Sequence, residues 1–256
     1  MENLMTEALQ PRVLLSWPTP PDYVPPIILS NRQVTLCPQG KAKGWSFGFF
    51  RVPESLIECP SGDYDLYEFV QRSDQIVDKK FDLVVIWTAS VDISYPLNTK
   101  KFQCPTLLLA GDTHHYEFPV GRLLAYLATE GFDYVATVYN HQHLHWFAAA
   151  GSQNLAWLPF ISMYPDFTSN WLEDKESRVV FVGHLNFNFY HHRRFKLINS
   201  LKEASFPLLI KSGVRDPRAL FRSSLISFNC SQNGELNLRN LEVISAGGFL
   251  LTDRLS

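Results

Sequence analysis

The sequence predicts an α/β protein with two doubly wound parallel sheets that follow one another along the chain. Continuous apolar runs of strand length alternate with helical segments, as buried parallel strands and their crossovers require. The alternation stops at a polar, irregular segment, residues 162–178, and then restarts. The 256 residues also exceed the roughly 100–200 of one domain. We therefore expect domains at 1–165 and 177–256.

The first domain begins with an apolar run at 12–17 that a proline-rich loop ends, because proline cannot continue a helix. Residues 33–60 give no clear pattern. Leu66, Phe69, Val70 and Ile76 recur at roughly helical spacing and predict a helix over 64–79. From there the expected elements are strands at 81–87 and 105–111, a helix at 120–131, a strand at 132–138, a helix at 143–151 and a strand at 154–160.

The second domain repeats the alternation. The expected elements are strands at 178–184, 206–213, 225–230 and 249–253, and helices at 192–204, 216–224 and 235–248. The chain stops directly after the last of these strands. A parallel strand normally needs a following helix to cover its face. We therefore expect the second domain to be incomplete.

Composition narrows the class of protein. With 46% hydrophobic and 19% charged residues the chain is able to build a core. The net charge of −2 gives no electrostatic reason to expect a nucleic-acid partner. Four scattered cysteines without a CxxC pair predict small buried or half-buried thiols, in keeping with a reducing compartment. No signal peptide or membrane span is recognisable, so we expect a soluble cytoplasmic protein.

One block carries a family resemblance. Residues 227–253, SFNCSQNGELNLRNLEVISAGGFLLTD, combine an asparagine–arginine pair, a glutamate, a small-residue segment and a terminal Thr-Asp. The block resembles the donor-binding region of GT-B glycosyltransferases, most closely the CgeB-like, "glycosyl transferases group 1" type. Weaker likenesses at 181–185, 112–119 and 154–159 extend the resemblance over roughly 80–256. Residues 1–80 resemble nothing we can name.

The resemblance implies two Rossmann-like domains that transfer a hexosyl group from a nucleotide-diphosphate sugar to an acceptor hydroxyl. The donor would sit mainly on the second domain and the acceptor on the first. No metal or cofactor is implied, and the sequence shows no DxD pair in the context of a predicted strand, no nucleophile elbow, no Walker loop and no HExxH motif. The donor sugar, its base and the acceptor are not identified.

Several residues of the block are candidates for binding the donor. Asn233 and Gly234 precede a predicted helix whose N-terminal amides suit a diphosphate. Arg239, near Asn237 and about one turn into the helix, would reach the diphosphate or stay solvated. Glu242 lies on the same side as Arg239. The resemblance implies that Glu242 binds the ribose hydroxyls, and the alternative is an exposed helix glutamate.

Four further donor candidates come from the start of the second domain. Gly183 follows a strand and would permit close approach of the donor. Arg193 and Arg194 open a helix, where basic residues oppose the helix dipole unless an anion compensates. Lys211 lies at the carboxyl end of a strand, the edge at which α/β sheets bind ligands.

The acceptor side has three catalytic candidates. Asp112, His114 and His115 follow a predicted strand in the first domain. The resemblance implies that one of the histidines lies near the transferred sugar. Asp112 would act as the base for the acceptor or cap the turn. His141, His143 and His145 also alternate, but a polar helix entrance explains them better than a metal site.

Two other functions remain open. Retaining relatives carry a glutamate eight positions before the ribose-binding one, where this chain has Gly234. This departure, with the expected truncation, favours a catalytically inactive GT-B-like nucleotide-binding or interaction module. A sugar-nucleotide epimerase is the third possibility, and it would release epimerised sugar without an acceptor.

Overall fold

A computed structural model describes residues 10–17, 29–38, 56–89, 94–113, 120–138, 141–159, 172–183, 185, 192–214, 216–231 and 235–254. The chain divides into two compact units between Leu158 and Pro159. Both units are built on parallel sheets with helices between the strands, which confirms the predicted fold class. In the part of the chain that is described, no helix is both long and apolar enough to cross a membrane.

Unit 1 holds a seven-stranded sheet in the order β3-β2-β1-β5-β7-β8-β9. All neighbouring strands pair in parallel. The strands are β1 (Val13–Ser16), β2 (Val34–Pro38), β3 (Leu56–Cys59), β5 (Leu83–Thr88), β7 (Thr106–Ala110), β8 (Tyr134–Thr137) and β9 (Leu155–Trp157). The chain starts inside the sheet and winds outward in both directions, so the order reverses between β1 and β5. That is the doubly wound arrangement of dinucleotide-binding folds.

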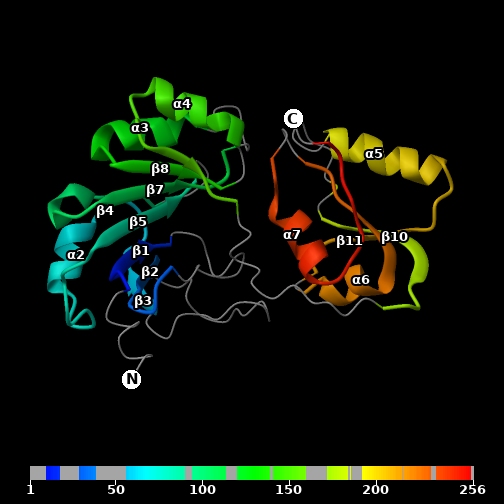
Figure 1. Ribbon diagram of the computed structural model, residues 1–256, viewed down its shortest axis with the longest axis horizontal. Coiled ribbons are helices and arrows are strands. Elements are labelled where there is room, and N and C mark those ends of the chain that lie inside the picture. The colour runs from blue at the N-terminus through cyan, green and yellow to red at the C-terminus, as the bar shows by residue number, and fades with distance from the viewer. Residues whose placement is uncertain are drawn as a thin grey trace. The chain divides into compact units, whose positions relative to one another are not determined.

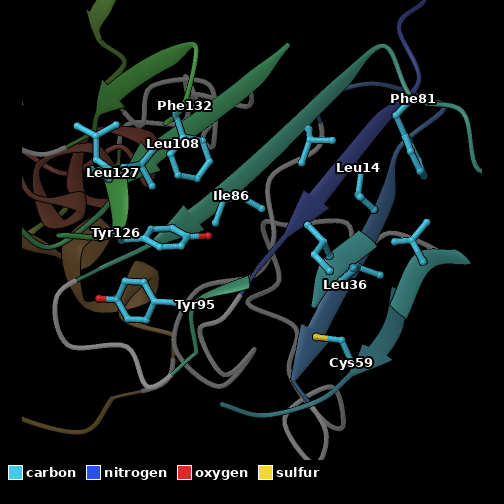
Figure 2. Close-up of a cluster of buried hydrophobic side chains, with 14 of the residues drawn as sticks. Leu14, Leu36, Cys59, Phe81, Ile86, Tyr95, Leu108, Tyr126, Leu127 and Phe132 are labelled. Carbon is cyan, nitrogen blue, oxygen red and sulfur yellow. The ribbon is translucent and has the colours of Figure 1, made fainter. Parts of the chain in front are cut away.

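The core of unit 1 lies against the apolar strands (Figure 2). Helix α3 (Gly121–Glu130) contributes Leu123, Tyr126 and Leu127, which are buried at helical spacing. The rings of Tyr95 and Tyr126 meet edge to face with centroids 4.9 Å apart. Gly131 ends α3 in the left-handed conformation, with φ of 63°.

The smaller elements of unit 1 are β4 (Tyr64–Asp65), β6 (Pro96–Leu97), the 3₁₀ helices η1 (Thr99–Phe102) and η2 (His141–His143), and α4 (Leu144–Ala149). Helix α2 (Leu66–Arg72) is much shorter than the predicted 64–79, because the extended backbone of Ser73 ends it. Ile76 still reaches the core from the turn that follows. Strands β2 and β3 fill part of the range 33–60, which has no clear apolar pattern.

Unit 2 holds a four-stranded parallel sheet in the order β11-β10-β12-β13. Its elements are β10 (Glu176–Val182), α5 (His192–Glu203), β11 (Leu208–Lys211), α6 (Arg218–Ser223), β12 (Ser224–Phe228), α7 (Leu238–Ser245) and β13 (Leu250–Leu251). Residues of α5 pack in one core cluster of the sheet, and residues of α6 and α7 pack in another. Figure 1 shows these three helices beside the sheet of unit 2. The strand order reverses between β10 and β12.

The turn from α7 into β13 leaves no room for a side chain at Gly248. An added Cβ would lie 2.9 Å from Val243 Cγ1, 3.0 Å from the Val243 carbonyl oxygen and 3.1 Å from that of Phe221. Because two of these neighbours are backbone atoms, we expect Gly248→Ala to destabilise unit 2 by about 2–3 kcal/mol. Urea denaturation would measure this loss.

Gly213→Ala is the matched control for this substitution. Gly213 has φ of 66° but no atom within 4 Å of an added Cβ, so only backbone strain applies. We expect a cost of about 1 kcal/mol there. If the two substitutions lowered the unfolding free energy equally, the close approach of backbone atoms to Gly248 would not be the reason for glycine at that position.

Candidate functional site

The candidate donor site lies where β10, β12 and β13 end and where α5 and α7 begin. In parallel α/β sheets ligands bind outside the carboxyl ends of the strands, at the point where the strand order reverses. In unit 2 that point lies between β10 and β12. The residues beyond these strand ends therefore decide what unit 2 can bind.

Asp253, two residues beyond β13, connects three elements at this edge. Its carboxylate accepts hydrogen bonds from the backbone nitrogen of Ser231 at 2.9 Å and from the Ser231 hydroxyl at 2.6 Å. It also pairs with Nη1 of Arg193, at the start of α5, at 2.6 Å. The side chain of Asp253 is only 7% exposed, whereas that of Arg193 is 58% exposed. Arg193 thus keeps a solvent-facing guanidinium that a buried carboxylate anchors.

The pKa of Asp253 follows from this arrangement. Burial would raise it, but the hydrogen bonds from Ser231 and the charge of Arg193 outweigh burial and hold the pKa below its ordinary value. Asp253 therefore stays ionised at neutral pH. It supplies part of the negative charge that compensates the basic start of α5, for which the sequence predicted a bound diphosphate.

The other basic candidates lie at the same edge. Arg194 donates to the Cys230 carbonyl oxygen at 3.3 Å, and its guanidinium lies 5.6 Å from the centroid of the Phe181 ring. Lys211 ends β11 with its side chain exposed. An added Cβ at Gly183 would lie 3.0 Å from Cζ of Phe181, so packing against that ring is a reason for glycine there.

A polar network sets the start of α7. Nδ2 of Asn229 donates to Oδ1 of Asn237 at 2.9 Å and to Oδ1 of Asn240 at 2.7 Å. Nδ2 of Asn237 in turn donates to Oε1 of Glu235 at 3.2 Å. Asn237 is the N-cap residue, so the helix begins at Leu238, later than the predicted 235. Asn233 and Gly234 lie outside the described residues.

Arg239 and Glu242 form an ion pair with one another along α7. Their side chains are 25% and 16% exposed. The guanidinium of Arg239 also lies 5.3 Å from the centroid of the Phe221 ring in α6. Both residues keep their predicted place on one side of the helix, and the pair holds them there. Diphosphate binding by Arg239 and ribose binding by Glu242 stay predictions.

No motif in the sequence predicts a site role for Asn229, Ser231, Glu235, Asn240 or Asp253 individually. Asn229 directly follows β12. Asn240 is only 3% exposed and Glu235 only 1% exposed. Polar residues at these depths are a signal of a hydrogen-bonded network. The sequence contains them, but their partners are set by the order of the strands.

In unit 1 the carboxyl end of β7 leads into Asp112. This residue is half-buried. Loss of solvent raises the pKa of its carboxyl to about 6, against the opposing effect of a hydrogen bond to its own backbone. A carboxyl group that titrates near neutral pH is suited to accept a proton. His114 and His115 lie outside the described residues.

The three alternating histidines face different neighbours. The ring of His141 lies 5.6 Å from that of Trp157, and the ring of His145 lies 4.6 Å from that of Trp146. His143 interacts instead with the backbone of Thr113. Within the described ranges, no three His, Cys, Asp or Glu side chains are placed to hold a metal ion.

The four cysteines are free thiols, and three of them are buried while Cys104 is half-buried. This confirms the predicted burial of the thiols. Burial raises the pKa of Cys59 and of Cys230 to about 11. Neither thiol is therefore a nucleophile at neutral pH.

No protein-family model matches the chain, and no curated protein matches it. Among solved structures, the crystal structure of a GtfA/B complex matches with a TM-score of 0.43 and 10% identity over 68% of this chain and 42% of that one. A UDP-forming α,α-trehalose-phosphate synthase from Burkholderia xenovorans matches with a TM-score of 0.41 and 9% identity over 74% of this chain and 62% of that one. The chain thus spans less than two thirds of either protein. The fold assignment rests on strand order and not on these likenesses.

Proposed function

We propose that this protein is a glycosyltransferase that moves a hexosyl group from a nucleotide-diphosphate sugar to an acceptor hydroxyl. The observation that carries the proposal is the solvent-facing guanidinium of Arg193 at the carboxyl edge of unit 2. It pairs with Asp253, whose carboxylate also accepts a hydrogen bond from the Ser231 hydroxyl. Ser231 and Asp253 both belong to the block 227–253, whose sequence resembles a donor-binding region.

The charges at this edge suit a diphosphate. Arg193, Arg194 and Lys211 bring three cationic side chains, and the amides at the start of α7 add the positive end of a helix dipole. Such fixed positive groups stabilise the charge that develops on a leaving diphosphate. The proposal needs no metal and no cofactor.

Asp112 is the proposed base on the acceptor side. In the transfer, the acceptor oxygen forms a bond to the anomeric carbon, and the bond between that carbon and the diphosphate oxygen breaks. The electron pair leaves with the diphosphate, and the acceptor proton passes to Asp112. The pKa of about 6 leaves this carboxyl mostly ionised at pH 7 and ready to accept the proton. The roles of His114 and His115 stay proposals.

Calorimetric titration with UDP, GDP, dTDP and ADP tests the donor site. We expect one nucleotide to bind, and Arg193→Ala to weaken its binding by about tenfold to one hundredfold, because a charged hydrogen bond contributes about 1.5–3 kcal/mol. If Glu242 binds the ribose, Glu242→Ala is expected to weaken the binding of the same nucleotide.

Lys202→Ala is the matched control, since Lys202 lies in the last turn of the same helix as Arg193. It removes the same charge far from the carboxyl edge, and we expect nucleotide binding to stay within about twofold. If no nucleotide binds to a folded chain, the donor-site assignment is wrong.

A nucleotide-binding module without activity is the second candidate. It is favoured by the pairing of Glu242 with Arg239, which occupies the carboxylate proposed to bind ribose. Nucleotide binding without transfer to any acceptor would select this candidate over the enzyme.

A further inference from the structure

The ion pair between Arg193 and Asp253 joins an exposed side chain to a buried one. Nη1 of Arg193 lies 2.6 Å from Oδ2 of Asp253, and the two side chains are 58% and 7% exposed. A pair with an exposed partner contributes little to stability, because the exposed side chain loses rotamer freedom to form it. The main consequence of the pair is therefore the direction in which the arginine points.

The carboxylate of Asp253 is held by residues other than Arg193. Oδ1 accepts hydrogen bonds from the Ser231 backbone nitrogen at 2.9 Å and from the Thr252 hydroxyl at 3.3 Å, and Oδ2 accepts one from the Ser231 hydroxyl at 2.6 Å. Ser231 and Asp253 follow paired strands, and the ladder between β12 and β13 continues to the Asn229 nitrogen, which donates to the Leu251 carbonyl. The sheet itself therefore fixes this carboxylate.

Arg193 comes from a different element, the first turn of α5, where the positive end of the helix dipole repels a cation. Residues 192–195, which begin this helix, include no acidic side chain that would hold the guanidinium there. Asp253 supplies that negative charge from the end of β13. Without it, the dipole favours rotamers that carry the guanidinium away from the start of α5.

Two effects of Asp253 on anion binding oppose one another. Its charge partly neutralises Arg193, which weakens the attraction for a phosphate. It also orders a long side chain in advance, so less rotamer freedom is lost when the ligand binds. Because the carboxylate also accepts from Ser231 and Thr252, its charge is shared among several donors. The guanidinium has five N–H donors in a rigid fork, and we expect its orientation to matter more than the lost attraction.

We propose that Asp253 is a positioning residue of the donor site, which directs the guanidinium of Arg193 toward the diphosphate, and that Ser231 holds Asp253 in place. This inference rests on the proposed nucleotide-sugar donor and adds two residues to its site. Asp253 acts through Arg193 and does not itself bind the donor.

A double-mutant cycle tests the proposal. Asp253→Asn keeps the shape of the side chain and an acceptor for the Ser231 nitrogen but loses the charge. In calorimetric titration with UDP, GDP, dTDP and ADP, we expect it to weaken the nucleotide that binds by about tenfold. In the Arg193→Ala background the same substitution should change affinity by less than about twofold. An equal loss in both backgrounds would mean a role in the fold alone, and tighter binding in Asp253→Asn would mean that Asp253 competes with the diphosphate. Either result overturns the proposal.

Glu176→Gln is the control, because it removes the same charge from the amino end of β10, where Glu176 pairs with Arg178. Nucleotide affinity should stay within about twofold there. If Asp253→Asn does not fold, Ser231→Ala takes its place in the cycle, since it removes only the hydroxyl bond to the carboxylate. We expect about threefold weaker binding in that variant, and no further loss when Arg193 is also replaced.

Nuclear magnetic resonance of the protein with ¹⁵N-labelled arginine tests the pair without any nucleotide. We expect separate Nη1 and Nη2 signals for Arg193 in the wild type, identified by their loss in Arg193→Ala, and a single averaged signal in Asp253→Asn. An averaged signal in the wild type overturns the proposal.

The two measurements also separate this inference from the proposed function. Nucleotide binding that weakens in Arg193→Ala but not in Asp253→Asn overturns the positioning role and leaves the donor site in place. If the folded wild type binds no nucleotide although the Nη signals are separate, the donor site is wrong. The pair would then be a structural one, and the positioning role falls with the site.

Discussion

Glu130→Ala is expected to destabilise unit 1 by about 3 kcal/mol, the largest stability change among our predictions. Glu130 ends α3 and is 9% exposed. Its carboxylate accepts hydrogen bonds from the backbone nitrogens of Asn98 at 3.1 Å and Thr99 at 2.8 Å, and from the Thr99 hydroxyl at 2.9 Å. Alanine would leave these donors buried without an acceptor, at the start of η1.

Urea denaturation followed by tryptophan fluorescence would measure this change, since Trp17 and Trp87 are in contact within unit 1, with ring centroids 4.3 Å apart. Glu130→Gln should cost less, about 2 kcal/mol, because the amide keeps one acceptor but loses the charge. Thr99→Ser keeps the hydroxyl and should cost within about 1 kcal/mol. A cost for Glu130→Ala no greater than that of Thr99→Ser would show that the carboxylate does not hold η1.

Asp112→Asn is expected to abolish transfer while stabilising the fold above pH 6. Loss of the proposed base should lower the transfer rate by about 100-fold or more. The pKa of Asp112 is raised to about 6 by burial, so the folded state binds more protons than the unfolded state between about pH 4 and 6. The wild type therefore loses stability as the pH rises through this window. The asparagine variant has no carboxyl group to ionise, so it does not lose stability in this window.

The difference in unfolding free energy between variant and wild type should be near zero below pH 4. It should reach a constant gain of about 1–2 kcal/mol above pH 6, a value reduced to allow for the partial exposure of Asp112. Denaturation curves at a series of pH values would test this. A gain that does not depend on pH would show that the carboxyl is not desolvated.

Asp133→Asn is the control with the opposite sign. Burial opposes ionisation of Asp133, but hydrogen bonds from Lys100 and Thr106 outweigh it and lower its pKa. Its contribution to stability is therefore present above the unfolded pKa of about 4 and is lost as the pH falls through the folded value. Asp133→Asn should destabilise the protein at neutral pH and approach the wild type in acid.

Local patterns in the sequence were sufficient to predict most elements of both sheets. β5 and β7 lie in continuous apolar runs, and such runs identify strands buried on both faces. The patterns failed where the local signal was weak. β2 and β3 lie in a range without a clear pattern, and α2 ends at Ser73 although Ile76 continues the apolar spacing.

The sequence alone thus determined the fold class, the alternation of its elements and the place of Asp112, Arg193 and Glu242 on them. The tertiary structure alone decided which of these residues meet. Arg193 pairs with Asp253, Thr113 adjoins His143, and Glu130 holds the start of η1. The spacing of apolar residues along the chain shows only whether a residue faces the core. It does not show which distant residue it contacts. These contacts join residues far apart in sequence, and the order of strands in the sheets brings them together.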